Sequence, residues 1–400
     1  MSGGSTYKID IGHIESGEWI KDTSATDGTK DSYSRFNYHN LNLNYDYLVF
    51  KIYPSSSSYH FTRFGFGYST TSSTGCVVNS NGFLQHCVER RGRLPYINTT
   101  TNATNYTYCT SYMECDNTII GESNTGNMAL NAAFYYGYRL KKINLGWPVH
   151  QWNVTNLSSM FSGCMVLEDL SELESWAPYT SNWHVTSIAS MFYNCFNLKK
   201  CGIFNWDVSG WGNTTTRAID FSGLFGYCTN IEKIDLSKWN TSLLNVTAIY
   251  NMFVGCNNVK EILIDNWITT NWTITRLDGV FSGCYQLVKL NLSGWDLSNC
   301  VITRTDNMFS GCYRVRDLSF IEGWDVSNWR VTQINGMFSN CRKISSLNLN
   351  NWDVSKWTVT RIDYLFNYCN NLKTLEVGEW DTSNWAVTNM GYLLACCYYL

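Results

Sequence analysis

Residues 337–369 read MFSNCRKISSLNLNNWDVSKWTVTRIDYLFNYC, and this stretch decides how the chain folds. It opens with Met-Phe-x-x-Cys at 337–341 and closes, 28 residues after that cysteine, with Leu-Phe-x-x-Cys at 365–369. Between them lie the aliphatic pair Leu347-x-Leu349 and the turn-like Trp-Asp-x-Ser-x-Trp at 352–357. A phrase restated at a fixed period of this length is typical of a repeat architecture.

The same phrase recurs ten times, from about residue 128 to residue 400. Nine cysteines head successive copies, and we call them the ladder cysteines: Cys164, Cys195, Cys228, Cys256, Cys284, Cys312, Cys341, Cys369 and Cys397. The steps between them are 31, 33, 28, 28, 28, 29, 28 and 28 residues. A degenerate copy with Ala-Phe-Tyr-Tyr-Gly at 133–137 precedes them, and the last copy lies at 393–397.

Each unit is expected to contain a short amphipathic helical turn, a strand and a second turn. In residues 302–312, Ile302, Thr305, Met308 and Phe309 fall at helical spacing. The aliphatic x-Leu-x-Leu that follows each cysteine has the period of two that places both side chains on one face of a strand. The phenylalanines of the motif are expected in the core: Phe161, Phe192, Phe225, Phe253, Phe281, Phe309, Phe338 and Phe366.

One such unit cannot bury its own apolar faces, whereas stacked units share a continuous core. Strands of successive coils would then pair along the axis at ~4.8 Å. The predicted fold is a repeat solenoid with one short parallel strand and one helical turn per coil of about 28 residues. It is expected to span residues 128–400.

The cysteine spacing favours reduced thiols. Equivalent cysteines in stacked coils would sit about 4.8 Å apart and point the same way, whereas a disulfide needs its Cβ atoms near 3.8 Å and facing each other. We therefore expect the ladder cysteines to act as small buried apolar residues.

Residues 1–127 differ from the repeats in composition and pattern. They contain strand-like stretches at 47–54 and 60–70 and turn clusters rich in Ser, Thr, Asn and Gly. They predict a β-rich domain that caps the first coil or anchors the rod. This region holds Cys76, Cys87, Cys109 and Cys115 beside His86, without the Cys-x-x-Cys pair typical of zinc sites. Two disulfides are the alternative under oxidising conditions.

Composition excludes several classes of function. The chain is 44% hydrophobic and 15% charged, with a net charge of −3, so it has no overall basic field for nucleic acid or anionic lipid. No apolar run approaches the roughly 18–20 residues that span a bilayer. The first residues lack the basic and apolar regions of a secretory signal peptide. We expect no cofactor and no metal site.

Tryptophans form two rows. The first row recurs nearly without exception, which indicates core packing, at Trp147, Trp206, Trp239, Trp267, Trp295, Trp324, Trp352 and Trp380. The second row is replaced by Leu244 and Cys300 in two coils, and a position that loses its ring is less constrained by a core. Packing and an exposed binding row both remain open for it, and the binding residues would be Trp152, Trp183, Trp211, Trp272, Trp329, Trp357 and Trp385.

A row of aspartates follows the first-row tryptophans, at Asp207, Asp296, Asp325, Asp353 and Asp381. Stacked carboxylates are candidate cation ligands, but an Asp in a turn also accepts backbone N–H groups. Asn240 at the equivalent position lacks the charge, which favours the turn. No phosphate loop, nucleophile elbow or HExxH motif is present, so no catalytic residue is predicted.

The repeats resemble the BspA-like leucine-rich repeats, the DUF285-type unit of bacterial surface proteins. That unit reads approximately W-D-T-S-x-V-T-x-M-x-x-M-F-x-x-C-x-x-L-x-x-L-x-L, and residues 324–349 match it at Trp-Asp-x-Ser, Val-Thr, Met-Phe-x-x-Cys and Leu-x-Leu. The resemblance covers about two thirds of the chain. This sequence departs from the pattern by added residues, often a second tryptophan, between Ser and Val-Thr.

The resemblance implies binding rather than catalysis. We expect a non-enzymatic recognition or adhesion protein, in the first place a phage virion appendage that contacts a bacterial surface. A cellular BspA-like surface adhesin and a structural subunit of a fibre or lattice are the alternatives. The expected location is a virion or cell surface, and the expected partners are a surface protein or glycan. Self-association or docking to a larger assembly is also expected, since the last coil shows no cap.

Overall fold

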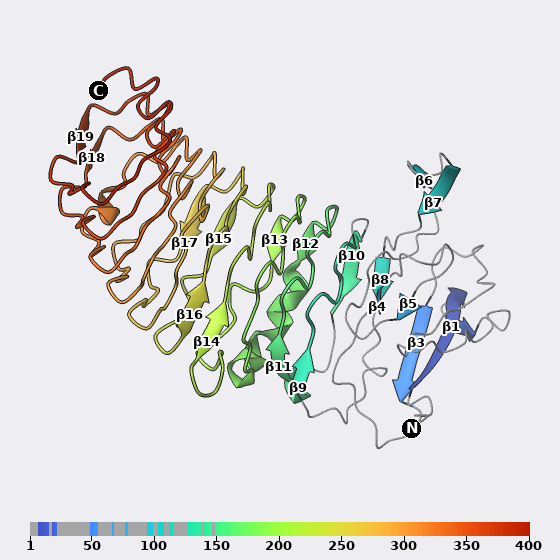
Figure 1. Cartoon of the computed structure of the whole chain (residues 1–400). Helices are drawn as coiled ribbons and strands as arrows, with labels where there is room; N and C mark the ends of the chain where they lie inside the picture. The colour runs from blue at the N-terminus through green and yellow to red at the C-terminus, as the bar shows by residue number, and fades with distance from the viewer. Residues whose placement is uncertain are drawn as a thin grey trace.

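The structure is a computed structural model that describes residues 7–15, 18–21, 49–54, 66–67, 77–78, 94–98, 103–107, 112–114, 127–137, 140–145 and 149–400. Its larger part is a stack of coils that ends at the C-terminus (Figure 1). Successive coils lie side by side, as expected from repeats that cannot bury their apolar faces alone.

The first ladder of parallel strands follows the ladder cysteines. It contains β8 (Tyr112–Glu114) with β10 (Lys142–Asn144), β12 (Asp169–Leu170) with β13 (Lys200–Cys201), β15 (Lys233–Asp235) with β17 (Glu261–Leu263), and β18 (Ser346–Asn348) with β19 (Thr374–Glu376). In the last pair Leu347 lies opposite Leu375, one repeat further on. The predicted parallel strand after each cysteine is confirmed in these coils.

A second parallel ladder, which the sequence did not lead us to expect, runs through the Val-Thr dipeptides, the equivalent residues of other coils and the residues directly after them. It contains β9 (Asn127–Ala129) with β11 (Asn153–Asn156) and β14 (Ala218–Asp220) with β16 (Asn245–Ala248). Single parallel bridges continue it through Arg276, Arg304, Gln333, Arg361 and Asn389. The valines point into the core, and most threonine hydroxyls donate to a carbonyl of the preceding coil, as from Thr360 to Thr332 at 3.3 Å.

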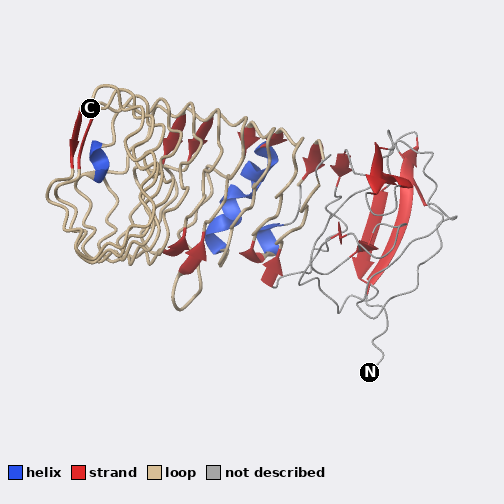
Figure 2. Cartoon of the chain, turned by 45° about the horizontal axis from the view of Figure 1, so that its top comes forward, coloured by secondary structure: helices blue, strands red, loops and turns tan. Residues whose placement is uncertain are grey.

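The helical turn predicted at Met-Phe-x-x-Cys is wrong, because the structure has consecutive β-turns there. In one coil Met308 N–H donates to the carbonyl of Thr305, and Cys312 N–H to that of Phe309. The intervening amide of Phe309 donates instead to Met337 of the next coil at 2.9 Å. A helix would use every amide within the coil, whereas a stacked coil needs alternate amides for its neighbour. The helices in the described residues are the 3₁₀ segments η1 (Val149–Gln151), η2 (Ser171–Asn182) and η3 (Ser319–Ile321), and strands and turns make up most of the stack (Figure 2).

The core is built from the predicted residues. Motif phenylalanines stack along the axis, with ring centroids 5.1 Å apart between Phe134 and Phe161 and 5.3 Å between Phe338 and Phe366. Each ladder thiol donates to the carbonyl of the motif residue one coil earlier, as from Cys284 to Phe253 at 3.3 Å. All ladder cysteines are free, so the prediction of unpaired thiols is confirmed.

The described part of residues 1–127 consists of short strands. β1 (Tyr7–Glu15) pairs antiparallel with β2 (Glu18–Lys21) and β3 (Val49–Pro54). Two further antiparallel pairs are β4 (Phe66–Gly67) with β5 (Val77–Val78), and β6 (Leu94–Asn98) with β7 (Ala103–Thr107). Because β8 belongs to the first parallel ladder, coil-like pairing begins upstream of the expected boundary at residue 128. Cys76, Cys87, Cys109, Cys115 and His86 lie outside the described residues.

Within the described residues, no helix has the length and apolarity needed to cross a membrane.

Candidate interaction surface

The second tryptophan row is packed in the core, so an exposed binding row at these residues is wrong. Trp152 is 4% exposed, the next five (Trp183, Trp211, Trp272, Trp329 and Trp357) are 0% exposed, and Trp385 of the last coil is partly buried against the core. Aromatic side chains bury a large apolar area each, which favours packing of this ring over its exposure. The two coils without the ring fill its place with buried Leu244 and Cys300.

The two rows interlock into one continuous series of indole contacts from Trp176 to Trp385. Trp357, for example, meets Trp352 and Trp380 at centroid distances of 6.0 and 6.3 Å and steep angles. Several first-row indoles also donate to a carbonyl of the preceding coil, as from Trp352 to Ile321 at 3.0 Å. Trp176, which our sequence analysis missed, takes the first-row place in the coil of η2. Trp147 lies outside the described residues.

The aspartate row closes turns. The Oδ1 atoms of Asp207, Asp296, Asp325, Asp353 and Asp381 accept the N–H of the serine two residues later, at 2.9 to 3.1 Å. Asn240 accepts the N–H of Ser242 in the same way. Hydrogen bonds from the serine lower the pKa of Asp325 and Asp353. The turn interpretation of this row is confirmed.

Metal-site and thiol chemistry have little support in the part of the chain that the structure describes. No group of three or more His, Cys, Asp or Glu side chains is arranged there to hold a metal ion. Burial raises the pKa of Cys256 to about 12 and holds that of Cys284 well above its usual value. Because the thiolate is the reactive form, these two thiols are protonated and unreactive at neutral pH.

Exposed aromatic side chains lie instead along the turns that carry Met-Phe-x-x-Cys, which we call the turn edge. It comprises the residues from six before to one after each ladder cysteine, and in the first coil those around Gly137, which takes the cysteine position. The tyrosines of the turn edge within the described residues are Tyr135, Tyr136, Tyr193, Tyr227, Tyr250, Tyr285, Tyr313, Tyr364, Tyr368, Tyr392 and Tyr398. Seven of them are 37% exposed or more, up to 71% for Tyr398.

Two positions of every turn edge have a left-handed backbone: the fifth residue before the cysteine and the residue directly before it. In the coil of Cys312 these are Asn307 (φ 55°) and Gly311 (φ 77°). Gly and Asn adopt this conformation most readily. Five of the twenty positions nevertheless carry tyrosine, at Tyr136, Tyr227, Tyr364, Tyr368 and Tyr392. A left-handed residue with a side chain costs about 1–2 kcal/mol.

The tyrosine rings are held in place by neighbouring coils. A Cβ atom on Gly163 would lie 2.5 Å from Cδ1 of Tyr136, and Gly255 has the same relation to Tyr227, so each ring rests on a glycine of the next coil. Tyr364 and Tyr392 stack at 5.1 Å. Burial, followed by its bond to Tyr136, raises the pKa of Tyr135 to about 12. The rings of Tyr136 and Tyr227 are therefore positioned by the fold before any partner arrives.

Sequence reasoning missed the turn edge because it counted tryptophans, whose ladder is regular. The signal was present: when the ten copies are aligned on the ladder cysteine, tyrosine recurs only at the positions five, two and one before the cysteine and one after it.

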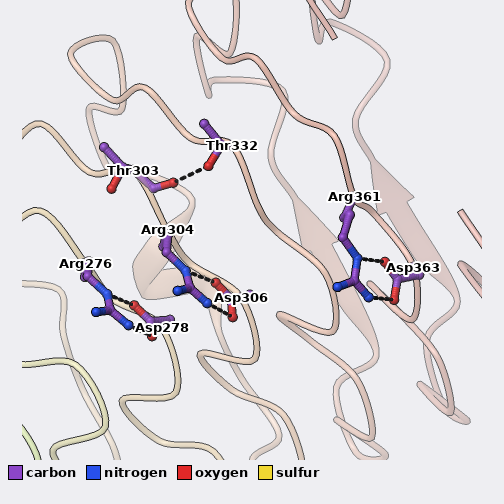
Figure 3. A network of polar contacts seen from close by, with 8 residues as sticks. All are labelled: Arg276, Asp278, Thr303, Arg304, Asp306, Thr332, Arg361 and Asp363. Carbon is purple, nitrogen blue, oxygen red and sulfur yellow. Dashed lines mark hydrogen bonds and ion pairs between the residues drawn. The ribbon is translucent and has the colours of Figure 1, made fainter. Parts of the chain in front are cut away.

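At the start of the turn edge lies a row of arginine–aspartate pairs, in which the arginine lies eight residues and the aspartate six residues before the cysteine. Arg304 donates from Nε and Nη2 to the two carboxylate oxygens of Asp306, both at 2.9 Å. Arg276 with Asp278 and Arg361 with Asp363 repeat the geometry, and all three pairs point the same way (Figure 3). The aspartates are buried while the arginines reach solvent. In these three coils the ion pair therefore stabilises the start of the turn.

Comparisons with known proteins bear on the whole solenoid. The family model described as "Mycoplasma protein of unknown function, DUF285" matches residues 114–218, 219–346 and 275–398. No curated protein matches the chain. Among solved structures, a leucine-rich repeat protein from Bacteroides ovatus is 12% identical, with a TM-score of 0.34, covering 85% of this chain and 80% of that one.

Two further solved structures are similar at the same low level. TLR13 in its complex with ssRNA13 is 15% identical with a TM-score of 0.24, covering 64% of this chain and 36% of that chain. A leucine-rich repeat protein of Leptospira interrogans is 10% identical with a TM-score of 0.21, covering 70% and 80%.

The family matches run from residue 114 to residue 398, through the same coils that carry the cysteine, phenylalanine and tryptophan rows. The chain thus belongs to the DUF285 family of BspA-like leucine-rich repeat proteins.

Proposed function

We propose that the protein is a non-enzymatic recognition protein displayed at a surface, and that the turn edge binds a protein on a facing cell. The observation that carries the proposal is the presence of exposed tyrosines in left-handed positions. Side chains kept at a conformational cost in positions that Gly or Asn would occupy more readily indicate a role other than folding.

The chemistry of the turn edge suits protein recognition. Tyrosine supplies a large contact area with only two side-chain torsions to order, and its hydroxyl pairs with polar groups of a partner. The rings of Tyr136 and Tyr227 already rest on glycines of the next coil, so little rotamer entropy is lost on binding. Repetition along the rod places several such contacts on one partner surface.

The place of display is the finer part of the proposal. A virion appendage that contacts a bacterial surface and a cellular adhesin of the BspA-like type both present such a rod outward. Family membership supports display at a surface in either setting. Mass spectrometry of purified virions and of cell envelopes from the source culture assigns one of them.

The test removes rings without disturbing the backbone. Asparagine tolerates the left-handed conformation, so Tyr227→Asn with Tyr368→Asn should leave the free energy of unfolding unchanged or slightly higher. Binding to whole cells should fall by about tenfold or more if each ring contributes as interface tyrosines do. Protease treatment of the cells should abolish binding of the unaltered protein.

The matched control is Ser190→Gly, which changes a left-handed position that carries no ring. It should bind as well as the unaltered protein. Full binding by the double tyrosine variant would remove the turn edge from the proposal, and binding that survives protease treatment of the cells would rule out a protein partner.

A further inference from the structure

Six exposed cations gather in four successive coils, within the five residues that follow each ladder cysteine. We call them the basic strip: Lys289, Arg314, Arg316, Arg342, Lys343 and Lys373. They follow Cys284, Cys312, Cys341 and Cys369, so the strip covers three steps between coils, or about 15 Å of the rod. The only acidic residue in the same twenty positions is Asp317.

The equivalent positions of the preceding four coils are electrically balanced. They hold four lysines and four acidic residues, and every lysine is paired, as Lys199 is with Glu168 and Lys260 with Glu232, both at 2.8 Å. The fold therefore permits ion pairs at these positions. Their absence in the basic strip is a property of its sequence.

The basic strip carries an excess of positive charge among the described residues. None of the six cations makes an ion pair with a described residue. Asp317 accepts the N–H of Ser319 at 2.8 Å, and Glu322 accepts that of Asn348 at 2.9 Å. Arg314 and Lys343 occupy the same position in adjacent coils, where unpaired like charges repel.

An aromatic stack borders the strip on the turn-edge side. The rings of Tyr285 and Tyr313 are parallel within 8° at a centroid distance of 4.7 Å. The guanidinium of Arg342 lies over the Tyr313 ring, 4.3 Å from its centroid. This cation–π contact fixes one cation of the strip without neutralising it, while Arg342 also donates to Oδ1 of Asn340 at 3.2 Å.

We propose that the basic strip binds an acidic polysaccharide, with sulfate or carboxylate groups paired to its arginines and lysines and sugar hydroxyls bonded to the amide and serine side chains between them. Gln286, Ser345 and Asn371 lie among the six cations and reach solvent. Arginine binds planar and tetrahedral oxyanions in a bidentate manner, and a chain that bears repeated charges engages several coils at once. The site borders the turn edge at Tyr285 and Tyr313, and it shares no residue with Tyr227 and Tyr368, the two tyrosines whose removal tests the turn-edge proposal.

The stack argues against a single-stranded nucleic acid as the occupant. Such strands gain much of their affinity from bases stacked on open aromatic faces. Both faces of Tyr313 are covered, one by Tyr285 and the other by Arg342. The exposed cations and the hydrogen-bonding groups of Gln286, Ser345 and Asn371 suit an anionic sugar chain.

The test measures binding of the full chain to heparin, as a sulfated probe, and to polygalacturonate, as a carboxylated one, at several salt concentrations. At least one of them should bind at low salt and weaken as salt rises, because release of counterions drives such binding. Arg314→Gln with Lys343→Gln should weaken it about tenfold and lower the salt dependence by about two ions.

The control is Lys199→Gln with Lys260→Gln, which removes two cations from the balanced coils and should leave binding unchanged. Equal weakening by the control, absence of binding to both probes at low salt, or tighter binding of an oligothymidylate than of either polysaccharide would overturn the proposal. Tyr227→Asn with Tyr368→Asn should bind the polysaccharides normally, so failure of the turn-edge proposal and failure of this one are distinguishable.

Discussion

The coils of Cys164 to Cys256 and the coils of Cys284 to Cys369 share one interior and differ at the surface. In both regions the motif phenylalanines stack, the ladder thiols bond to carbonyls one coil earlier, and the indoles interlock. In the five residues after the cysteine, the first region has four cations and four acidic residues, while the second has six and one. A solenoid that repeats its core leaves its outward positions free to vary from coil to coil.

A second difference lies in how the two regions hold the turn after the Val-Thr ladder. In the first region short side chains accept the N–H two residues on, as Asp220 does from Ser222 at 2.8 Å. In the second, arginine–aspartate pairs span the same positions. The coil of Cys341 has Gln333 and Asn335 there instead. The same backbone is thus stabilised locally in two ways.

Alkaline pH should have the largest effect and should strike both regions alike, because both carry the thiol ladder. Burial raises the pKa of Cys256 from 9.0 to about 12. The folded state therefore keeps protons that the unfolded chain releases above pH 9, and its stability is full below pH 9 and falls as pH rises toward 12. Between these two pH values each such thiol lowers the free energy of unfolding by about 1.4 kcal/mol per pH unit.

Urea unfolding followed by circular dichroism at pH 7, 9 and 10 measures this loss. Cys256→Ala removes one titrating thiol, so its stability should fall less steeply with pH. A free energy of unfolding that stays level between pH 8 and pH 10 would contradict the buried, protonated ladder.

Removal of an indole should lower the free energy of unfolding by about the same amount in either region if both regions have the same interior packing. Trp272→Ala and Trp357→Ala each delete a fully buried ring in contact with other indoles, and each should lower the free energy of unfolding by about 3–5 kcal/mol. Chemical denaturation of the two variants, followed by tryptophan fluorescence and circular dichroism, makes the comparison. A marked inequality would show that the two regions differ in packing as well as at the surface.

The side-chain bonds that stabilise the turn after the Val-Thr ladder should contribute differently to stability in the two regions, by a smaller amount than the indoles do. Asp306→Ala removes a buried carboxylate that accepts two bonds from Arg304 and should cost about 2 kcal/mol. Asp220→Ala removes one bond to a backbone N–H and should cost about 1 kcal/mol. Thermal and urea unfolding of both variants measure the two losses of stability. A larger loss for Asp220→Ala than for Asp306→Ala would show that the arginine–aspartate pairs do not stabilise their region more strongly.

The smallest effect is a predicted gain in stability. Thr305 is 0% exposed and its hydroxyl has no hydrogen-bond partner among the described residues. The equivalent positions in neighbouring coils hold Leu277 and Ile334. Thr305→Val should therefore raise the free energy of unfolding by about 1 kcal/mol, measured by urea denaturation. A loss of stability would indicate a polar partner such as bound water.

Repetition made most of the fold predictable. A 28-residue period, an alternating Leu347-x-Leu349 and a cysteine at a fixed place already predict stacked coils with parallel strands and unpaired thiols. The Met-Phe-x-x-Cys turn was mistaken for a helix because both conformations place apolar residues three and four apart. Only the stacked structure shows that alternate amides, such as that of Phe309, bond to the next coil.

The sequence by itself determined that this chain repeats, that its motif phenylalanines and ladder cysteines face the interior, and that it belongs to one repeat family. The tertiary structure alone decided which aromatic rings reach solvent: the second-row tryptophans turn inward and the turn-edge tyrosines outward. It also decided which lysines find a carboxylate in the preceding coil and which do not. The physical reason is that exposure and ion pairing depend on neighbours one coil away, about 28 residues distant along the chain but about 4.8 Å away in space.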